Sequence, residues 1–382
     1  MNLSEALASL KTKLDKLSIK EDKGHLDHPE DLIFLGGSSG ASRALQSTIA
    51  TAKNPKTVTI KWDGYPALIF GRNIDGKFSI MDKHMFNKKD LTGRQVFSPE
   101  QFVQYDKARG VERDSLWPII ARIWPGLEKA SSGSKGYYWG DLLFSQPLQD
   151  QNGMYVFKAN PNGITYKVNT NSELGQLIGG EQAGIAVHQY IDPNSPNTDH
   201  ATSLNGTIGK LKNNSDVAIV PSAMPIAPKV KIDNALVKGV QNAITKYGSA
   251  VDQLMDTAPQ ARNTFNQLFT VYINKKIVAG DLSNLAGGFM DFVESRPMTD
   301  KMKAKIAEHL NNNKEGIIGA FTIWAEMYKL KMSIVNQLNK AAEASPVKGY
   351  LQDGTETHEG FVANGLKFVD RMGFSRQNLA GR

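Results

Sequence analysis

The hydrophobic pattern of this 382-residue chain changes in kind at a proline-rich stretch, and this change constrains the fold more than any other feature. Between about residues 58 and 190, short apolar and β-branched runs alternate with turn residues, which is typical of β-strands. Pro221, Pro225 and Pro228 then follow one another closely, and neither a helix nor a central strand accepts them. Beyond them, apolar residues recur at helical spacing to about residue 344. The sequence therefore predicts a mixed α+β body and a separate all-helical region.

The pattern also predicts the individual elements. We expect strands over residues 58–60, 67–70, 78–81, 137–144, 155–158, 164–168 and 184–190, with helices over 41–52 and 114–123. In the helical region we expect helices over residues 235–247, 250–255, 261–279, 282–294, 299–311 and 317–342. A glycine-rich segment over residues 36–42 lacks the Gly-Lys-Ser/Thr ending of a phosphate-binding loop, so we interpret it as a turn and helix start.

Composition limits the chemistry that this chain can use. It contains no cysteine, which excludes a disulfide framework, a thiolate zinc site and a cysteine nucleophile. A metal would have oxygen or imidazole ligands, which favours Mg²⁺ with a phosphate substrate. The net charge of +7 suits a polyanionic partner. No run of about 18 apolar residues and no basic-then-apolar leader occur, so we expect neither membrane span nor signal peptide, and a soluble cytoplasmic protein.

A lysine lies between two of the predicted strands, in the tetrapeptide Lys61-Trp62-Asp63-Gly64. A lysine ordinarily keeps its proton, with a pKa of about 10.4, and then cannot attack an electrophile. Burial or neighbouring cations lower that pKa and produce a nucleophile. The tetrapeptide alone is equally compatible with a simple Asp-Gly turn, so the rest of the chain has to decide between the two interpretations.

Two further segments combine an acid, a glycine and an apolar strand. Asp141 lies in the run Tyr-Tyr-Trp-Gly-Asp-Leu-Leu-Phe over residues 137–144, and Glu359 begins Glu-Gly-Phe-Val shortly before an apolar strand that carries Lys367. In this order, the segments resemble the motifs of the covalent nucleotidyltransferase superfamily, which contains ATP-dependent DNA ligases, RNA ligases and mRNA capping enzymes. The resemblance implies an adenylation domain of antiparallel sheets with flanking helices over residues 1–228 and 349–382, and a helical domain inserted over 229–348.

The resemblance implies a lysine nucleophile and its cationic neighbours. Lys61 would attack the α-phosphorus of ATP, expel pyrophosphate and carry AMP on its nitrogen. Lys367 would stabilise the charge that develops on the α-phosphate. DNA ligases have an arginine two residues beyond the glycine, where this chain has Pro66, and we expect Arg72 to take over that phosphate contact. The last motif usually has two alternating lysines, whereas Phe368 and Val369 follow Lys367 here.

The same resemblance implies how ATP and Mg²⁺ would be held. Asp63 would orient the ribose or the metal shell, and Gly64 would let the backbone approach the nucleotide. Asp141 would bind the ribose hydroxyls, and Glu359 would hold Mg²⁺ directly or through water. His188 lies where the family has an aromatic residue that stacks on the adenine, although a packed core histidine is an equal alternative.

These expectations lead to a function and its alternatives. The leading interpretation is a compact ATP-dependent ligase of the bacteriophage type, a monomer that seals 5′-phosphate/3′-hydroxyl nicks in duplex DNA and tolerates RNA-containing strands, in the host cytoplasm if phage-encoded. An RNA ligase, a capping-type guanylyltransferase and an inactive nucleic-acid-binding module of the same fold are the alternatives. We expect no C-terminal OB domain after Lys367, so the helical region would clamp the nucleic acid instead. The expected phosphate contacts are Lys83, Lys88, Lys275, Lys276, Lys301, Lys303, Lys305 and Arg371.

Overall fold

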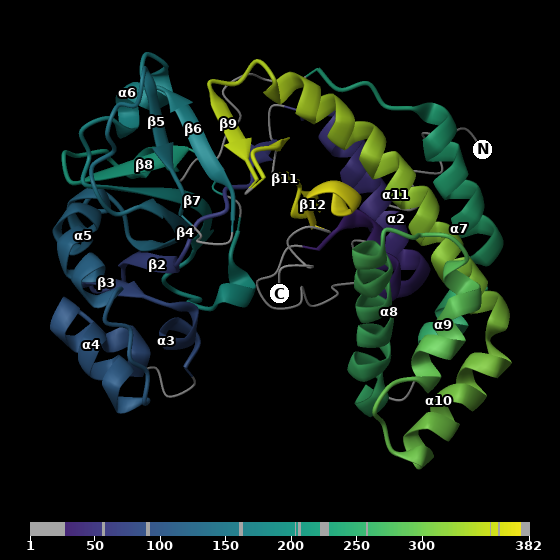
Figure 1. Ribbon diagram of the computed structural model, residues 1–382. Coiled ribbons are helices and arrows are strands. Elements are labelled where there is room, and N and C mark those ends of the chain that lie inside the picture. Colours follow the sequence, from purple (N-terminus) through teal and green to yellow (C-terminus); the bar gives the residue numbers. More distant parts are fainter. Residues whose placement is uncertain are drawn as a thin grey trace. The chain divides into compact units, whose positions relative to one another are not determined.

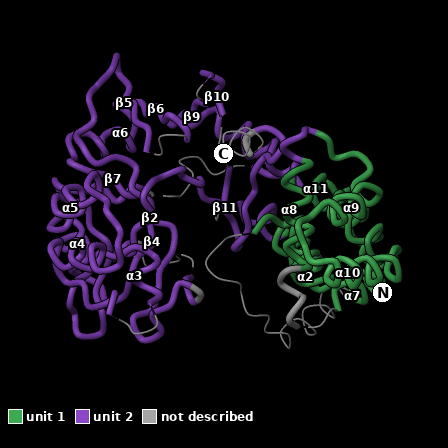
Figure 2. Tube along the Cα trace, turned by 60° about the horizontal axis from the view of Figure 1, so that its bottom comes forward, with its two compact units in different colours: residues 1–49, 233–276, 281–331 green, residues 50–232, 277–280, 332–382 purple. Residues whose placement is uncertain are grey.

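The chain has a mixed α+β fold, as the sequence predicts, and it divides into two compact units. The computed structural model describes residues 27–55, 58–88, 92–159, 163–202, 204, 208–221, 229–256, 259–351, 353–357 and 360–375 (Figure 1). One unit combines residues 1–49, 233–276 and 281–331, and we call it the helical unit. The other combines residues 50–232, 277–280 and 332–382, and we call it the sheet unit (Figure 2).

The largest sheet of the sheet unit has five strands in the order β3-β2-β4-β7-β8. Its strands are β2 (Ala67–Arg72), β3 (Phe78–Met81), β4 (Gly136–Phe144), β7 (Ala183–Ile191) and β8 (Val217–Pro221). Neighbours run antiparallel except β7 and β8, which are parallel. The helices α3 (Lys83–Asn87), α4 (Pro99–Ala108) and α5 (Trp117–Ala130) share one apolar core with this sheet. Burial of apolar side chains from both helices and strands therefore stabilises this layer.

Helix α5 is longer than the sequence indicates at its C-terminal end. We expected it to end at Ile123, before Pro125, but it continues to Ala130. Pro125 removes a backbone N–H and so leaves the carbonyl of Ala121 without a helical partner. Both residues are exposed, so water can satisfy that carbonyl, while Leu127 and Ala130 farther along the helix are buried. Burial of the last turn therefore outweighs the proline.

Two smaller sheets complete the sheet unit, and both join segments that are distant in sequence. One sheet has the order β10-β9-β6-β5, and the other has the order β1-β11-β12. Their strands are β1 (Thr59–Ile60), β5 (Met154–Phe157), β6 (Thr165–Asn169), β9 (Val347–Tyr350), β10 (Glu356–Thr357), β11 (Phe361–Ala363) and β12 (Leu366–Phe368). Figure 1 shows β9, from the C-terminal part of the chain, beside β6. The short helix α6 (Glu173–Ile178) follows β6. The C-terminal strands β9 and β11 thus pair with β6 and β1, and β1 directly precedes Lys61.

The helical unit is built around stacked aromatic rings. It contains α7 (Asn234–Met255), α9 (Leu285–Glu294) and α10 (Asp300–Asn312), and most of α2 (Leu32–Lys53), α8 (Pro259–Ala279) and α11 (Lys314–Ala342), whose last residues are assigned to the sheet unit. Phe269 stacks on Phe34 and on Phe289, with ring centroids 4.9 and 4.3 Å apart. The two helices that we expected over 235–247 and 250–255 form one continuous helix, α7, through Gly248. A Cβ at Gly248 would lie 3.1 Å from the Cβ of Ser38, so glycine permits this close approach.

The glycine-rich segment of the helical unit is a kink in α2. Gly36 and Gly37 have non-helical dihedral angles inside that helix. The backbone N–H and the hydroxyl of Ser38 both donate to the carboxylate of Asp252, at 2.7 and 2.6 Å. The N–H and hydroxyl that a phosphate-binding loop would offer to phosphate are therefore occupied by a carboxylate of the chain itself. This agrees with the interpretation of the segment as a turn and helix start.

The helical unit also buries an ion pair. Lys331 and Glu30 are both fully buried, and the Nζ of Lys331 lies 2.6 Å from Oε1 of Glu30. Next to Glu30, Asp31 accepts a hydrogen bond from the indole N–H of Trp324 at 2.8 Å. Buried charges need such partners because transfer out of water is costly. Among the described residues, no helix is long and apolar enough to cross a membrane.

Candidate active site at Lys61

Lys61 leaves strand β1 at the edge of the three-stranded sheet. Thr59 is opposite Val362 on β11, and the N–H of Lys61 donates to the carbonyl of Gly360 at 3.0 Å. Val362 in turn is opposite Lys367 on β12. Since side chains alternate between faces along a strand, Lys61 projects on the same face as Thr59, and Lys367 shares that face. The sheet register thus brings two lysines separated by some 300 residues to one surface.

A tight hairpin fixes the position of Lys367. Strands β11 and β12 are joined by Asn364 and Gly365, both with positive φ, 49° and 74°. An Asn-Gly pair is the preferred sequence for this kind of two-residue turn, because both residues tolerate left-handed backbone. The side-chain amide of Asn364 also donates to the hydroxyl of Thr51 at 2.9 Å. The turn therefore determines the register that aligns Lys367 with the Lys61 strand.

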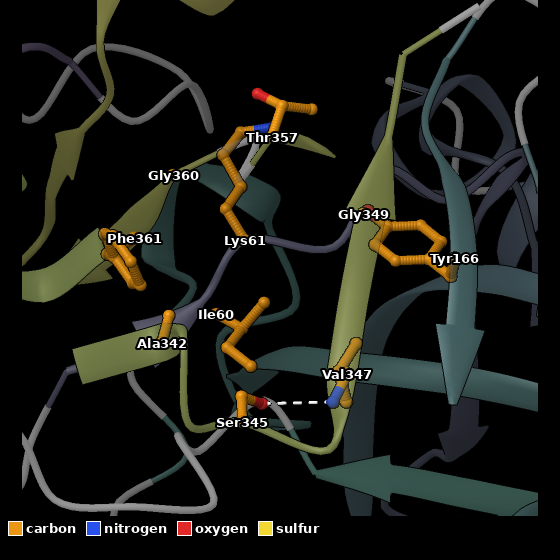
Figure 3. A pocket seen from close by; sticks show the side chains of 10 residues that line it. All are labelled: Ile60, Lys61, Tyr166, Ala342, Ser345, Val347, Gly349, Thr357, Gly360 and Phe361. Carbon is orange, nitrogen blue, oxygen red and sulfur yellow. Dashed lines mark hydrogen bonds between the residues drawn. The ribbon is translucent and has the colours of Figure 1, made fainter. Parts of the chain in front are cut away.

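A small cavity adjoins Lys61. Its volume is about 20 Å³, room for about one water molecule. Figure 3 shows its lining, in which the side chain of Lys61 runs toward Thr357. The cavity is lined by Ile60, Lys61, Tyr166, Ala342, Ser345, Val347, Gly349, Thr357, Gly360 and Phe361. The hydroxyl of Ser345 accepts a hydrogen bond from the N–H of Val347 at 3.2 Å and fixes one corner of it. The cavity encloses part of Lys61 in apolar surroundings, and a nucleotide would need several hundred Å³ more.

The surroundings of Lys61 favour its neutral form. Burial and the positive charge of Lys367 lower the pKa of Lys61 from 10.5 to about 8, against the opposing influence of Asp63 and Asp141. Burial disfavours the charged amine, and a second cation adds repulsion. At pH 7 about one molecule in ten would then carry a neutral amine, compared with fewer than about one in 1,000 for an ordinary lysine. The geometry therefore provides a lysine that can act as a nucleophile near neutral pH.

Asp63 is held in place by the neighbouring sheet. Its backbone N–H donates to the hydroxyl of Tyr166 at 2.7 Å, and its Oδ2 accepts from the N–H of Ile164 at 3.4 Å. Burial raises the pKa of Tyr166, which therefore stays a neutral hydroxyl. Trp62 is 5% exposed and packs on Tyr166, with ring centroids 4.9 Å apart. Sequence analysis did not single out Tyr166, because nothing in the pattern of its strand indicates which aromatic residue reaches Asp63.

Gly64 brings the Lys61 segment onto strand β4. A Cβ at Gly64 would overlap the Cβ of Asp141 and would lie 3.0 Å from the carbonyl oxygen of Leu142. Only glycine permits this close approach, so Gly64 places Asp141 directly beside the lysine segment. The structure therefore brings together five of the residues that the sequence indicated. These are Lys61, Asp63, Gly64, Asp141 and Lys367.

Asp141 is flanked by a histidine and an aromatic surface. Its Oδ2 lies 3.5 Å from Nε2 of His188, which is about a third exposed and lies on the neighbouring strand β7, at a β-bulge two residues beyond Ala186, the partner of Asp141 in the register. The ring of His188 lies 5.7 Å from the ring of Trp139, and the ammonium of Lys83 lies 5.4 Å from a ring centroid of Trp139. This places His188, indicated by the sequence, beside Asp141, and Lys83 against the buried Trp139. The row of Lys83, Trp139, His188 and Asp141 combines aromatic rings, a cation and a carboxylate, the groups that can hold a nucleoside.

Other predicted residues lie elsewhere. Arg72 is opposite Gly136, at the far end of β2 from the pair Ala67 and Asp141. Its guanidinium donates to the carbonyls of Gly76 and Glu128, so the structure does not bring it to Lys61. The expectation that Arg72 replaces the arginine missing at Pro66 therefore has no geometric support.

The predicted phosphate contacts are spread over both units. Arg371 is 2% exposed, so it cannot meet a nucleic-acid backbone in this structure. In the sheet unit Lys88 lies over the ring of Tyr105. In the helical unit Lys275 lies over the ring of Phe292, and Lys276 pairs with Asp281 at 2.8 Å. Helix α10 carries Lys301, Lys303 and Lys305, of which the first and last are exposed.

Of the residues that the sequence indicated for Mg²⁺ and nucleotide binding, Asp63 and Asp141 offer oxygen ligands in the described structure. Glu359, the predicted Mg²⁺ ligand, lies outside the described residues, directly before Gly360. Within the part of the chain that the structure describes, no group of three histidine or carboxylate side chains could hold a metal ion. The carboxylates of Asp63 and Asp141 are hard oxygen donors of the kind that Mg²⁺ contacts directly or through water. Together with the two lysines they also fit a magnesium nucleotide.

Comparison with known proteins identifies a family. Residues 23–382 match the model of DUF6267, a family of unknown function, so the chain belongs to that family. No curated protein matches the chain. No solved structure matches it either. A function for this chain therefore has to be argued from its own residues.

Proposed function

We propose that this member of the DUF6267 family is an ATP-dependent polynucleotide ligase that forms a lysyl-AMP intermediate on Lys61. The observation that carries the proposal is the convergence of Lys61 and Lys367 on one sheet face beside Asp63 and Asp141, together with a lowered pKa of Lys61, about 8. A partly buried lysine with a cation rather than a carboxylate as its strongest charged neighbour is disfavoured structurally. Reactivity gives a reason for the arrangement.

Each residue of the site has a chemical task in the proposed first step. Lys61 loses one proton to solvent, and its lone pair forms a bond to the α-phosphorus of ATP while the bond to pyrophosphate breaks. A second proton then leaves the nitrogen for solvent, which gives the lysyl-AMP phosphoramidate. Lys367 stabilises the negative charge on the α-phosphate oxygens, and bound Mg²⁺ would neutralise charge on the leaving pyrophosphate. Asp141 accepts hydrogen bonds from the ribose hydroxyls. His188, 3.5 Å from Asp141, lies next to the base.

The proposed place of ATP follows from the room available. The cavity between Lys61 and Thr357 holds about 20 Å³ and cannot take a nucleotide. Asp141, which does not line this cavity, lies close enough to Lys61 to act on its pKa, and His188, about a third exposed, is next to Asp141. We therefore assign the ribose and base to the row of Asp141, His188 and Trp139, with the phosphates directed toward Lys61 and Lys367. Aromatic and polar groups of this kind commonly orient a nucleotide base and sugar.

The test is covalent labelling. The protein is incubated with Mg²⁺ and ATP labelled at the α-phosphate, and the labelled band is followed after denaturation. We expect label on the unaltered protein and none on Lys61→Ala. The matched control is Lys348→Ala, because Lys348 lies in the same unit on β9, is partly buried and pairs with Glu356 at 3.0 Å. Absence of any Lys61-dependent band would refute the proposal and favour an inactive module, whereas a band with labelled GTP only would favour a guanylyltransferase.

The adenylylated protein then reports on the strand that it joins. It is freed of ATP and offered nicked duplex DNA, a nicked DNA–RNA hybrid or single-stranded RNA. We expect transfer of AMP to the 5′-phosphate of nicked duplex DNA, followed by release of AMP on sealing. Transfer to single-stranded RNA alone would identify an RNA ligase instead.

The lysines of α10 support a nucleic-acid partner and have their own test. The triple variant Lys301→Glu, Lys303→Glu and Lys305→Glu reverses the charge of the first turns of α10 without changing any buried residue. If these lysines contact phosphates, the variant should seal nicks at least about 10-fold more slowly in low salt and should show a weaker salt dependence. Lysyl-AMP formation should be unchanged. If the triple variant and the unaltered protein seal nicks at the same rate, these lysines are ordinary solvent-exposed charges that do not contact the nucleic acid.

A further inference from the structure

An exposed aromatic side chain lies four residues beyond the proposed nucleophile. Tyr65 is 64% exposed, the most exposed of the large hydrophobic side chains in the described residues. Among the residues that the structure describes, none stacks on the ring of Tyr65 or places a cation over it, and none forms a hydrogen bond with its hydroxyl. An isolated exposed apolar residue is ordinary on a protein surface. The position of Tyr65, rather than its exposure alone, makes it informative.

The backbone that carries Tyr65 is held against strand β4. The N–H of Tyr65 donates to the carbonyl of Leu142 at 2.9 Å, and the N–H of Leu142 donates to the carbonyl of Pro66 at 3.1 Å. On the other side, Gly64 lies so close to Asp141 that no larger residue fits. The ring therefore extends into solvent from a fixed backbone immediately beside the carboxylate of the proposed nucleotide site. The backbone is fixed and a tyrosine side chain has only two χ angles to order, so the ring loses little conformational entropy when it binds, which favours its use for recognition.

The charge around Tyr65 indicates the chemistry of its partner. Lys61 precedes it on the same segment, and Lys61 and Lys367 share one sheet face. Lys83 lies over Trp139, two residues before Asp141 on β4. An exposed ring on the segment that carries Lys61 suits a nucleobase attached to phosphates, because bases stack on aromatic rings and the cations of the site attract the backbone. His188 and Trp139 lie on the sheet itself and provide the proposed surface for the base of ATP. The ring of Tyr65 is far more open to solvent, where a long strand can reach it.

We propose that Tyr65 stacks on a base of the polynucleotide substrate next to the 5′-phosphate that receives AMP. This inference rests on the proposed ligase function and names the group that positions the strand. Stacking on an aromatic ring changes affinity by about 5- to 150-fold per base, equivalent to about 1–3 kcal/mol. It is tolerant of sequence, because every base presents a π-face. The ring thus orients the strand without selecting its sequence.

The test compares Tyr65→Ala with Tyr65→Phe. Binding of a fluorescent nicked duplex is measured on the Lys61→Ala background, so that no chemistry occurs, and AMP transfer to the nick is measured with Lys61 intact. We expect Tyr65→Ala to weaken duplex binding by about 10-fold and to raise the KM for the nicked strand similarly, whereas Tyr65→Phe behaves like the unaltered protein. The matched control is Ile74→Ala, since Ile74 is 53% exposed in a turn of the same unit.

The outcomes separate this inference from the proposed function. Lysyl-AMP formation with normal duplex binding by Tyr65→Ala would overturn the stacking role and leave the ligase proposal intact. A raised KM for ATP in lysyl-AMP formation, with unchanged duplex binding, would show that the ring contacts the nucleotide and would also overturn the inference. A loss in Ile74→Ala equal to that in Tyr65→Ala would attribute the effect to general surface change and overturn it as well.

Discussion

Each unit withdraws a lysine from solvent, Lys331 fully and Lys61 in part, and the two lysines have opposite surroundings. In the helical unit, Lys331 is fully buried and its ammonium lies 2.6 Å from a carboxylate oxygen of Glu30. In the sheet unit, Lys61 has Lys367 as its strongest charged neighbour, and its pKa is lowered to about 8. One environment neutralises a charge by pairing it, and the other disfavours the charge itself. The difference teaches that burial is compatible with a charged, paired lysine, whereas burial beside a second cation favours the neutral amine.

The largest expected effect is the loss of chemistry at Lys61. Lys61→Arg keeps a positive charge, but a guanidinium is not deprotonated in proteins and cannot supply a lone pair. We expect lysyl-AMP formation to fall by more than about 1,000-fold, which corresponds to a barrier higher by at least about 4 kcal/mol. The measurement is the rate of labelling from α-labelled ATP. The matched control is Lys331→Arg, at the paired lysine. The folded fraction of this variant should be labelled at the same rate as the unaltered protein.

The next effect is a loss of stability at Lys331. Lys331→Ala removes the ammonium that pairs with the buried carboxylate of Glu30, and we expect the free energy of unfolding to fall by about 3–5 kcal/mol. Urea unfolding followed by circular dichroism measures it. The double variant Glu30→Leu with Lys331→Met should recover much of the loss, because it removes both charges. If Lys331→Ala lowered the free energy of unfolding no more than Lys348→Ala does, the contrast between Lys331 and Lys61 would be contradicted.

A smaller effect should appear in the pH dependence of labelling. Because the amine of Lys61 has to be neutral, the rate of lysyl-AMP formation should rise about 10-fold per pH unit below pH 8 and level off above its pKa of about 8. Lys367→Met removes the cation that lowers this pKa, so the midpoint of the profile should move to higher pH. We also expect the plateau rate to fall about 10-fold, since Lys367 stabilises charge on the phosphate. A midpoint unchanged in Lys367→Met would mean that the two lysines do not interact.

The strands that carry the site could be predicted from the sequence better than the contacts that their residues make. The strands expected over 137–144 and 184–190 agree with β4 and β7 within about a residue, because β-branched and aromatic runs bounded by turns are strong local signals. The association of Lys61 with Asp141 and Lys367 is a long-range property, and only the resemblance to a known motif order indicated it. Arg72 shows the limit, since adjacency in sequence placed it at the site, whereas six residues of strand carry it to the far end of β2. Likewise, nothing local indicated that Tyr166 would reach Asp63.

The smallest expected effect is a gain in stability when Lys61 is replaced by an apolar residue of similar length. The folded-state pKa of Lys61 is about 8 and the unfolded-state value is 10.5. The unfolded chain therefore binds more protons between these pH values, so the contribution of this group to the free energy of unfolding rises with pH across that window. Below pH 8 both states are protonated, and the destabilising effect is complete. Lys61→Met should then be more stable than the unaltered protein by about 1 kcal/mol at pH 7, and this advantage should shrink as the pH approaches 10.5. Urea unfolding at pH 7 and pH 10 measures the difference, with Lys348→Met as the control for losing a paired lysine of the same unit. A Lys61→Met variant that is less stable than the unaltered protein at pH 7 would show that Lys61, like Lys331, contributes to the fold through its charge.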